Sequence, residues 1–315
     1  MTVSWPDEVD AVFAGDMTAA LAYLTPAGGA VTTAVAPVGL RDRDQGTVTF
    51  TTSLGFGKKL KRIERDPRVA LAYHARDHGF ASSRSYVLVQ GRCRPVPPAD
   101  PAWNERVLGP VSARFMGPPR HGPFWDRWLR EYYADRVPVT IDVERVVVWP
   151  ALDCSGDPVV LGADRPAQEP APQRAPKKGT APRLDSRKAA TKLASMPHLL
   201  VSWREPDGFP VVVSGRLEGA DAGGIRLGSE AGLPRGGRRA GVLGHSYEAK
   251  LVGLRSRQHT GWLADGVFSP HTASAFRAPS NKTLVLLGNG LLAKRGLRRA
   301  RREARSHLNS YGMSK

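Results

Sequence analysis

The sequence contains little cysteine and no long apolar run, and both absences restrict the kind of protein it encodes. Only Cys93 and Cys154 are present, too few for a disulfide framework, and no Cys-x-x-Cys pair offers metal-ligand spacing. No stretch approaches the roughly 20 apolar residues of a membrane-spanning helix. The first residues, MTVSWPDEVD, carry no apolar signal core. We therefore expect a protein of the reducing cytoplasm with no membrane span.

Several familiar catalytic signatures are also missing. The sequence has no Gly-x-Ser-x-Gly nucleophile motif and no Gly-x-x-x-x-Gly-Lys phosphate loop. His74 and His78 are four residues apart, but they begin beyond a predicted strand, so they do not share a helix face. The other histidines show no ligand spacing: His121, His198, His245, His259 and His271. We predict no metal site and assign no catalytic side chain.

Glycine, proline and basic residues are abundant instead. The 33 glycines and 26 prolines favour many turns and short strands over long helices. A formal net charge of +17 suits phosphorylated ligands, nucleic acid or an anionic surface. The arginine-rich usage of a high-GC genome explains the same charge, so the charge alone names no partner.

A Pro/Ala-rich segment divides the chain into two parts. Residues 164–182, DRPAQEPAPQRAPKKGTAP, contain almost no large apolar side chain and cannot bury a core. We predict a flexible, disordered linker over residues 156–190. It joins a first domain, 1–155, to a second domain, 191–290. A basic C-terminal helix and tail, 291–315, follow and suit RNA, an anionic membrane or plain solvent.

The first domain is predicted to open with a helix over Asp7–Tyr23 and to continue as short strands. The predicted strands are Gly29–Val38, Thr47–Thr52, Val69–His74, Tyr86–Pro95 and Val137–Trp149. An insertion at about 98–136 separates the last two strands. It contains FWDRWLREYYADR, whose aromatic residues recur at helical spacing. This helix either packs on the strands or also walls a substrate pocket.

The second half repeats the first in the same order. The parallel segments are FPVVVSGRLEG (209–219) with GAVTTAVAPVG (29–39), GGIRLGSE (223–230) with GTVTFTTS (46–53), RAGVLGHS (239–246) with RVALAYHA (68–75), and YEAKLVGLRSR (247–257) with SYVLVQGRCR (85–94). These echoes predict a diverged tandem copy. Between its second and third strands the first half has SLGFGKKLKRIERDP, whereas the second has only SEAGLPRGGR, too short for the helix.

That helix makes residues 47–74 the most informative segment. A strand ending in Thr51 and Thr52 runs through a Gly-containing loop into a basic helix opened by Lys58 and Lys59. A helix N-terminus offers unpaired N–H groups and partial positive charge, which suit a phosphate. A strand–helix–strand unit with a solvated basic face is the alternative, and in either case we expect Lys59 to be exposed.

Residues 49–72 resemble the pyridoxamine 5'-phosphate oxidase-like family, the FMN-binding split barrels. Its members show an apolar strand ending in Thr-Thr or Thr-Ser, a short loop, a lysine eight residues before a proline, and Asp/Asn-Pro-Arg-Val opening the next strand. Lys59 stands eight residues before Pro67, and DPRV at 66–69 matches in full. The resemblance covers most of residues 18–150, through VTTAVAPV (31–38), YVLVQGRC (86–93) and VERVVVWP (143–150), with a diverged second copy at about 195–290.

The resemblance implies a mainly β fold with minor α, two tandem split barrels, and a flavin bound at a dimer interface. The lysines and hydroxyls would hold the cofactor phosphate, the strand at 33–35 would run beside the ring, and Trp149 would stack near the ring or the opposite protomer, unless it is a core aromatic. The implied cofactor-binding residues are Thr33, Ala34, Val35, Thr51, Thr52, Lys58, Lys59 and Trp149. The cofactor is FMN, or alternatively the deazaflavin coenzyme F-420, with haem third.

The sequence departs from the family in two places. Ala36-Pro37 stands where many members carry a bulky aromatic, and the carboxy-terminal Arg/His substrate signature of the true pyridoxamine phosphate oxidases is missing, which argues against the vitamin B6 reaction. Our first hypothesis is a flavin- or deazaflavin-dependent oxidoreductase acting on a small organic molecule, as a homodimer or as an intramolecular pseudo-dimer of its two halves. The alternatives are a non-catalytic flavin or haem binder and, more weakly, a nucleic-acid-associated protein.

Overall fold

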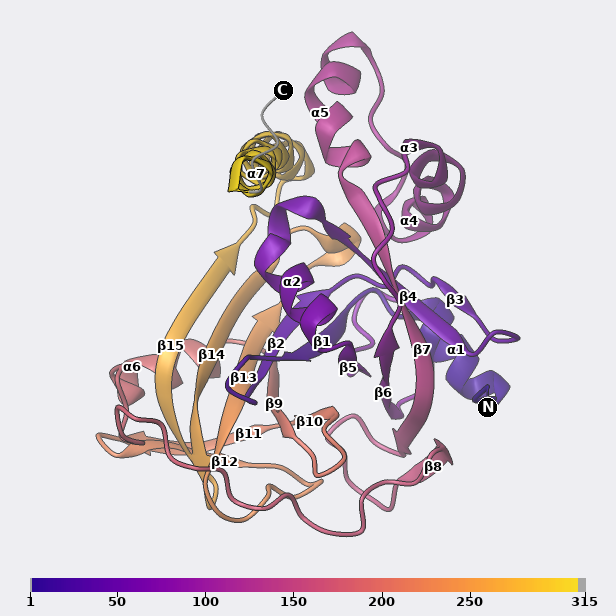
Figure 1. The fold of residues 1–315 in the computed structure, drawn as a ribbon. Coiled ribbons are helices and arrows are strands. Elements are labelled where there is room, and N and C mark those ends of the chain that lie inside the picture. Colours follow the sequence, from indigo (N-terminus) through magenta and orange to yellow (C-terminus); the bar gives the residue numbers. More distant parts are fainter. Residues whose placement is uncertain (1, 311–315) are drawn as a thin grey trace.

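The computed structural model describes the backbone of residues 2–310 and contains two antiparallel sheets, one from each half of the chain (Figure 1). The first has the strand order β2-β1-β5-β6-β7-β4-β3, with β8 added beside β7. Its strands are β1 (Ala19–Leu24), β2 (Ala30–Val35), β3 (Arg41–Asp42), β4 (Thr47–Ser53), β5 (Arg68–Tyr73), β6 (Tyr86–Cys93), β7 (Arg136–Trp149) and β8 (Val159–Gly162). The fold is mainly β, as predicted.

The second sheet has the order β10-β9-β13-β14-β15-β12-β11. Its strands are β9 (His198–Arg204), β10 (Pro210–Ser214), β11 (Arg216–Asp221), β12 (Gly224–Gly228), β13 (Arg238–Ser246), β14 (Arg255–Ala264) and β15 (Val267–Arg277). If β9 to β15 are matched in turn to β1 to β7, the two orders are identical. The two halves therefore share one topology.

Each sheet also carries a β-bulge at the same place. The register of β6 on β7 shifts at Gly91, and that of β14 on β15 shifts at Gly261. A Cβ on either glycine would lie 2.1 Å from a backbone oxygen of the neighbouring strand, Asp142 O or Ser269 O. The correspondence corrects the fourth sequence echo: β6 matches β14, whereas residues 247–254 form a connection that includes the short helix η3 (Ala249–Leu251).

The predicted first helix is too long. Helix α1 spans Asp7–Gly15, and residues 19–24 form strand β1. All six residues of β1 are buried, with Leu21 and Tyr23 in the core of the first barrel and Ala20 and Ala22 in a core shared with the second domain. A strand buried on both faces reads as a continuous apolar run, which periodicity alone does not separate from a helix.

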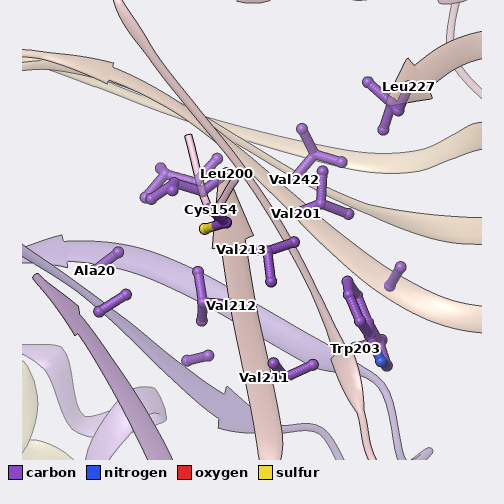
Figure 2. Close-up of a cluster of buried hydrophobic side chains, with 14 of the residues drawn as sticks. Ala20, Cys154, Leu200, Val201, Trp203, Val211, Val212, Val213, Leu227 and Val242 are labelled. Atoms are coloured by element: carbon purple, nitrogen blue, oxygen red, sulfur yellow. The ribbon is translucent and has the colours of Figure 1, made fainter. Parts of the chain in front are cut away.

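One hydrophobic core crosses the boundary between the domains. It combines Ala20 and Ala22 with Leu200, Val201 and Val212 of the second sheet. In Figure 2, Val212 lies next to the strand that carries Ala20 and Leu200 lies beside Cys154, whereas Val201 lies beside Val242. Because small alanines line the first sheet here, the two sheets can approach closely.

The contacts across this boundary are reciprocal. Strand β2 packs on β9, β13 and β14, and its counterpart β10 packs on β1, β5 and β6. Tyr86 Oη donates to Val212 O (2.8 Å) and Gln90 Nε2 donates to Pro210 O (2.8 Å). From the other side, Gln258 Nε2 donates to Thr32 O. This is the pattern of an isologous two-fold interface, here formed within one chain.

Helices lie around the sheets. The first domain has α1, the 3₁₀ turn η1 (Leu54–Phe56) and α2 (Gly57–Arg65). The insertion forms α3 (Pro101–Trp103), the π-helix η2 (Asn104–Leu108), α4 (Gly109–Met116) and α5 (Pro123–Ala134). The second half adds α6 (Ser186–Ala194) and α7 (Lys282–Ser310). Between residues 2 and 310, no helix combines the length and hydropathy needed to cross a bilayer.

The basic C-terminal helix begins earlier than predicted, at Lys282 and not at Leu291. Helix α7 lies against α5 and η1: Trp128 Nε1 of α5 donates to Leu287 O (3.2 Å), and a Cβ on Gly296 would lie 2.9 Å from Gly55 Cα. The predicted aromatic helix therefore packs against α7. Residues 311–315 of the predicted tail lie outside the described residues.

The linker follows a defined path, so the predicted disorder is not what the structure shows. The predicted linker range, 156–190, contains β8 and the start of α6. Between them the chain has no helix or strand, but Gln173 Nε2 donates to Gly28 O of the first domain (3.1 Å). Its Oε1 accepts from Arg239 N of the second domain (3.1 Å). Polar contacts thus hold a segment that lacks the apolar residues to form a core.

Candidate functional site

The segment that follows β4 forms the strand–loop–helix unit predicted for phosphate binding. Ser53 caps η1 by accepting from Gly55 N (3.0 Å), and α2 follows at once. Leu60 and Ile63 are the buried residues of α2 and pack it against the first sheet, while Lys58 and Arg65 are exposed. Asp66 ends the helix, because the following proline disfavours further helical backbone.

Lys59 is partly buried, so the expectation that it is exposed is wrong. Its Nζ lies 5.7 Å from the ring centre of Phe50 and 5.2 Å from that of Phe56. Burial, together with the nearby charge of Arg136, lowers the pKa of Lys59 to about 7. Within the part of the chain that the structure describes, Lys59 has no ion pair and no hydrogen bond. An ammonium group placed this way lacks an anion.

Thr52 supplies a second unpartnered group at this place. Its side chain lies on the same face of β4 as Phe50, over which Lys59 sits, because side chains two apart share a face. Thr52 is 2% exposed and its Oγ1 has no hydrogen-bond partner among the described residues. The buried hydroxyl of Thr52 and the ammonium of Lys59 thus both lie on the Phe50 side of β4, and Arg136 is close enough to lower the pKa of Lys59. We refer to Thr52, Lys59 and Arg136 as the cradle.

An acidic residue lies beside the cradle but does not neutralise Lys59. Asp135 accepts a hydrogen bond from Ser53 Oγ, and its Oδ1 has no partner in the described residues. Burial raises the pKa of Asp135. Next to it, Arg136 pairs with Ser53 across the strands and holds its guanidinium 4.6 Å from the ring centre of Tyr132. Arg136 was not predicted, because it lies far from the lysine motif in sequence.

The other predicted phosphate ligands are placed differently. The side chain of Thr51 points to the opposite face of β4 from Thr52, so the structure does not bring it to Lys59. Lys58 is exposed at the first turn of α2. Only one residue of each predicted pair, Thr52 and Lys59, converges on the cradle.

The predicted ring-side strand is β2. Thr33 shares a face with Val31 and Val35, which belong to the core of the first barrel, and this strand approaches β4. Ala34 faces the second domain and packs on the shared core. Residues 33–35 therefore lie at the seam between β4 and the second domain.

Trp149 lies apart from the cradle. It ends β7, whereas Val137, near the start of that strand, pairs with Thr52. The two ends are separated by about 40 Å along the strand, at ~3.3 Å per residue. Trp149 is 2% exposed and packs edge-on against Tyr86, with ring centres 5.6 Å apart. The structure thus shows the core aromatic that the sequence left as an alternative.

At the corresponding place in the second domain, the chain's own linker takes the position beside the β12–β13 loop. Glu169 Oε2 accepts from Arg235 N (3.1 Å), Pro170 O accepts from Arg238 Nη1 (3.0 Å), and Gln173 N donates to Gly237 O (2.8 Å). No helix forms between β12 and β13. The two domains therefore have the same strand order, but only the first has the helix that carries Lys59.

Three histidines that looked unrelated in the sequence meet at the domain boundary. His74 follows β5, His245 lies in β13 and His198 opens β9. His74 Nε2 lies 2.6 Å from His245 Nε2, and His198 Nε2 lies 2.9 Å from Asp77 Oδ2. Strand register makes His74 the counterpart of His245, so this contact lies on the pseudo-two-fold axis. The aligned segments RVALAYHA and RAGVLGHS already contained this signal.

The hydrogen bonds assign the protons of this pair. His74 Nδ1 lies 3.0 Å from Ala72 O, a carbonyl that can only accept, so Nδ1 carries the proton. His74 Nε2 then accepts from the Nε2–H of His245. Burial lowers the pKa of His74 to about 3, lowers that of His245 well below its usual value, and also lowers that of His198. The lowered pKa values make the cluster a neutral contact between the domains. Among the described residues, no group of three or more His, Cys, Asp or Glu side chains is placed to hold a metal ion.

No protein-family model matches the sequence, and no curated protein is significantly similar to it. Among solved structures, a conserved hypothetical protein from Mycobacterium tuberculosis is similar, with 22% identity, 47% of this chain and 86% of that chain covered, and a TM-score of 0.35. A haem-binding protein from Mycobacterium smegmatis has 14% identity, 94% and 99% coverage, and a TM-score of 0.32.

A pyridoxamine 5'-phosphate oxidase-related, FMN-binding protein from Nostoc punctiforme has 11% identity, covers 63% of this chain and 87% of its own, and has a TM-score of 0.29. The structural neighbours thus include proteins of the family that the sequence resembles.

Proposed function

We propose that the protein binds the phosphate of a flavin, FMN or a deazaflavin, in the cradle of Thr52, Lys59 and Arg136, and that it is an oxidoreductase. The observation that carries the proposal is Lys59, a partly buried ammonium with a lowered pKa and no described anionic partner, beside the free hydroxyl of Thr52. A phosphate would supply the missing charge and the missing acceptor. A bound flavin would carry the hydride, while the protein would position it and exclude water.

The cradle favours a phosphate-bearing cofactor over haem. A haem iron takes an axial ligand such as histidine, cysteine, methionine or tyrosine, and the cradle of Thr52, Lys59 and Arg136 contains none of these. The proposal therefore ranks flavin binding above haem binding.

We also propose that the second domain is the opposing wall of this site, so that one chain acts as a pseudo-dimer. Gln258 reaches Thr32 O of β2, and Thr260 Oγ1 lies 2.6 Å from Thr272 Oγ1 on the paired strand. By alternation, Ser256 and Ser274 lie on this same polar face of β14 and β15.

Light scattering on flavin-loaded protein tests the pseudo-dimer. It should find a monomer with one flavin per chain, and an obligate homodimer would contradict the pseudo-dimer.

The main test compares two adjacent lysines. Lys59→Ala should raise the Kd for FMN about 10- to 100-fold, because a charged hydrogen bond contributes roughly 1.5–3 kcal/mol. Lys58→Ala, a matched change at an exposed position, should leave the Kd within about twofold. Quenching of flavin fluorescence gives both values. Equal affinities of Lys59→Ala and wild type would remove the phosphate assignment.

A pH series strengthens this test. Because the free Lys59 has a pKa of about 7, a rise in pH above 7 removes the charge that the phosphate needs. The affinity should therefore fall by up to about tenfold per pH unit, and the Lys59→Ala profile should be flat. Bleaching of the bound flavin by a nicotinamide donor would then separate an oxidoreductase from a flavin-storage protein.

A further inference from the structure

One end of the molecule presents a surface that the proposed cofactor site does not use. Helices α5 and α7 lie together there, at the top of the view in Figure 1. They are joined through Trp128, whose ring centre lies 3.9 Å from Lys294 Nζ and whose Nε1 donates to Leu287 O. This contact fixes which side of α7 faces the protein.

Three leucines of α7 face away from that contact. Leu284, Leu291 and Leu292 are 53%, 42% and 53% exposed, whereas Leu286 and Ala293, on the other side of the helix, are buried. Positions 284, 288, 291 and 292 fall along one side of a helix with 3.6 residues per turn. The leucines therefore form an apolar stripe that nothing in the described residues covers.

Helix α5 carries a further exposed apolar side chain. Phe124 is 58% exposed and stacks on Trp128, with ring centres 6.1 Å apart and planes 7° from parallel. Exposed large apolar residues that gather on neighbouring elements mark a binding surface, whereas scattered ones do not.

Positive charge follows on the same side of α7. Arg295 and Arg298 are exposed and extend the line of the leucines. Residues 294–305, KRGLRRARREAR, contain seven lysines and arginines and one glutamate. Leucine and phenylalanine beside arginine is the composition of a helix that lies in the interface of an anionic bilayer. A nucleic acid would use the arginines but gain nothing from the exposed leucines.

We propose that the exposed leucines of α7, with Phe124 of α5 and with Arg295 and Arg298, form a docking surface for an anionic lipid bilayer. The occupant is the membrane surface itself: the arginines attract the acidic headgroups, and the apolar side chains enter the boundary between headgroups and acyl chains. The helix lies on the bilayer and does not cross it. The inference is independent of which cofactor the cradle holds.

Vesicle co-sedimentation of the full chain tests this proposal. The protein should bind vesicles of equal parts phosphatidylglycerol and phosphatidylcholine and should not bind phosphatidylcholine alone. Replacing the three leucines together, Leu284→Ser, Leu291→Ser and Leu292→Ser, should weaken partitioning by about tenfold or more. These side chains are already exposed, so the fold should be retained, and circular dichroism checks this.

The matched control removes apolar surface elsewhere. Val159 and Val267 are 60% and 37% exposed on β8 and β15, and Val159→Ser with Val267→Ser should leave vesicle binding unchanged. Arg295→Ser with Arg298→Ser should reduce the preference for acidic lipid. The proposal is overturned if wild type ignores acidic vesicles, if the leucine variant binds like wild type, if RNA binds in preference to vesicles, or if the leucines instead hold a dimer seen by light scattering.

Discussion

The two domains share a strand order and a bulge, but they differ at the connection between the fourth and fifth strands. In the first domain this connection forms η1 and α2 and presents Lys59 beside Thr52. In the second it is a short loop, and residues 169–173 of the linker pack against it. Strand pairing is thus compatible with either connection, because the register of each sheet is fixed elsewhere, by the cross-strand pairs and the buried faces.

The difference teaches which features belong to the barrel and which to the site. Each domain has a glycine at its bulge, Gly91 in the first and Gly261 in the second, so we attribute these glycines to the fold. The cradle occurs in the first domain alone among the described residues, so the shared strand order does not require it. Three predictions test this division, from the largest expected effect to the smallest.

The largest effect is expected at the bulge glycines. Gly91→Ala and Gly261→Ala should each lower the free energy of unfolding by about 2–4 kcal/mol, because the new Cβ would meet a strand carbonyl at 2.1 Å. Gly57→Ala is the control, since a Cβ there meets nothing within 4 Å. Urea unfolding measures all three. A large loss at one bulge and none at the other would break the equivalence of the two sheets.

A smaller effect is expected from pH at the axis between the domains. His74 and His245 are neutral in the folded protein because their pKa values are lowered, whereas they titrate near 6.5 when unfolded. The unfolded chain therefore binds more protons below pH 6.5, and stability should fall as the pH falls from about 6.5 toward 3. The slope should approach about 1.4 kcal/mol per pH unit for each histidine.

Other groups at the boundary modify this slope. His198 adds to it, because its pKa is also lowered. Asp16 opposes this slope, because burial raises its pKa from 3.8 to about 8. Between these two pH values the folded protein keeps a proton on Asp16 that the unfolded chain has lost. The measurement therefore compares two proteins. Urea unfolding gives the free energy of unfolding of wild type and of His74→Gln at pH values from 7 to 5. The variant should lose part of the dependence, and His121→Asn, at an exposed position, should keep it; parallel profiles for wild type and His74→Gln would contradict the assignment.

The smallest effect is expected in the linker. Gln173→Ala should cost about 1 kcal/mol, because it removes hydrogen bonds to Gly28 O and from Arg239 N that connect the linker with both domains. Gln45→Ala, whose backbone N–H and not its side chain makes the recorded contact with Asp42, should cost less than about 0.5 kcal/mol. Thermal unfolding compares the two. A Gln173 variant as stable as wild type would mean that the linker contacts add nothing.

Local sequence was sufficient to predict those elements whose structure depends only on neighbouring residues. The strand–loop–helix unit at residues 47–66 forms as predicted, because the β-branched run, the glycine loop and the Asp-Pro stop all act on neighbouring residues. The order of the repeated strands was also readable. The alignment failed at the fourth strand, since the long turn at 247–254 shifts β14 by eight residues and the few shared identities did not reveal it.

Long-range contacts account for the other differences. β1 resembled a helix because both of its faces are buried, one of them by the second domain. The linker was expected to be disordered because its composition cannot form a core, whereas polar groups of two domains hold it. Arg136 and the histidine pair could not be found by spacing, since strand pairing and domain packing bring them to their sites.

The sequence by itself determined the mainly β class, the two-part chain, and the one connection that ends a strand with hydroxyls and opens a helix with lysines. These follow from propensity and capping, which act over a few residues. Only the tertiary structure decided that Thr52 and Lys59, and not Thr51 and Lys58, lie on the Phe50 side of β4. It also decided that two equivalent histidines meet on an axis and that Trp149 lies in the core. Such choices depend on which face each strand turns toward its neighbours, and packing across the whole chain sets that face.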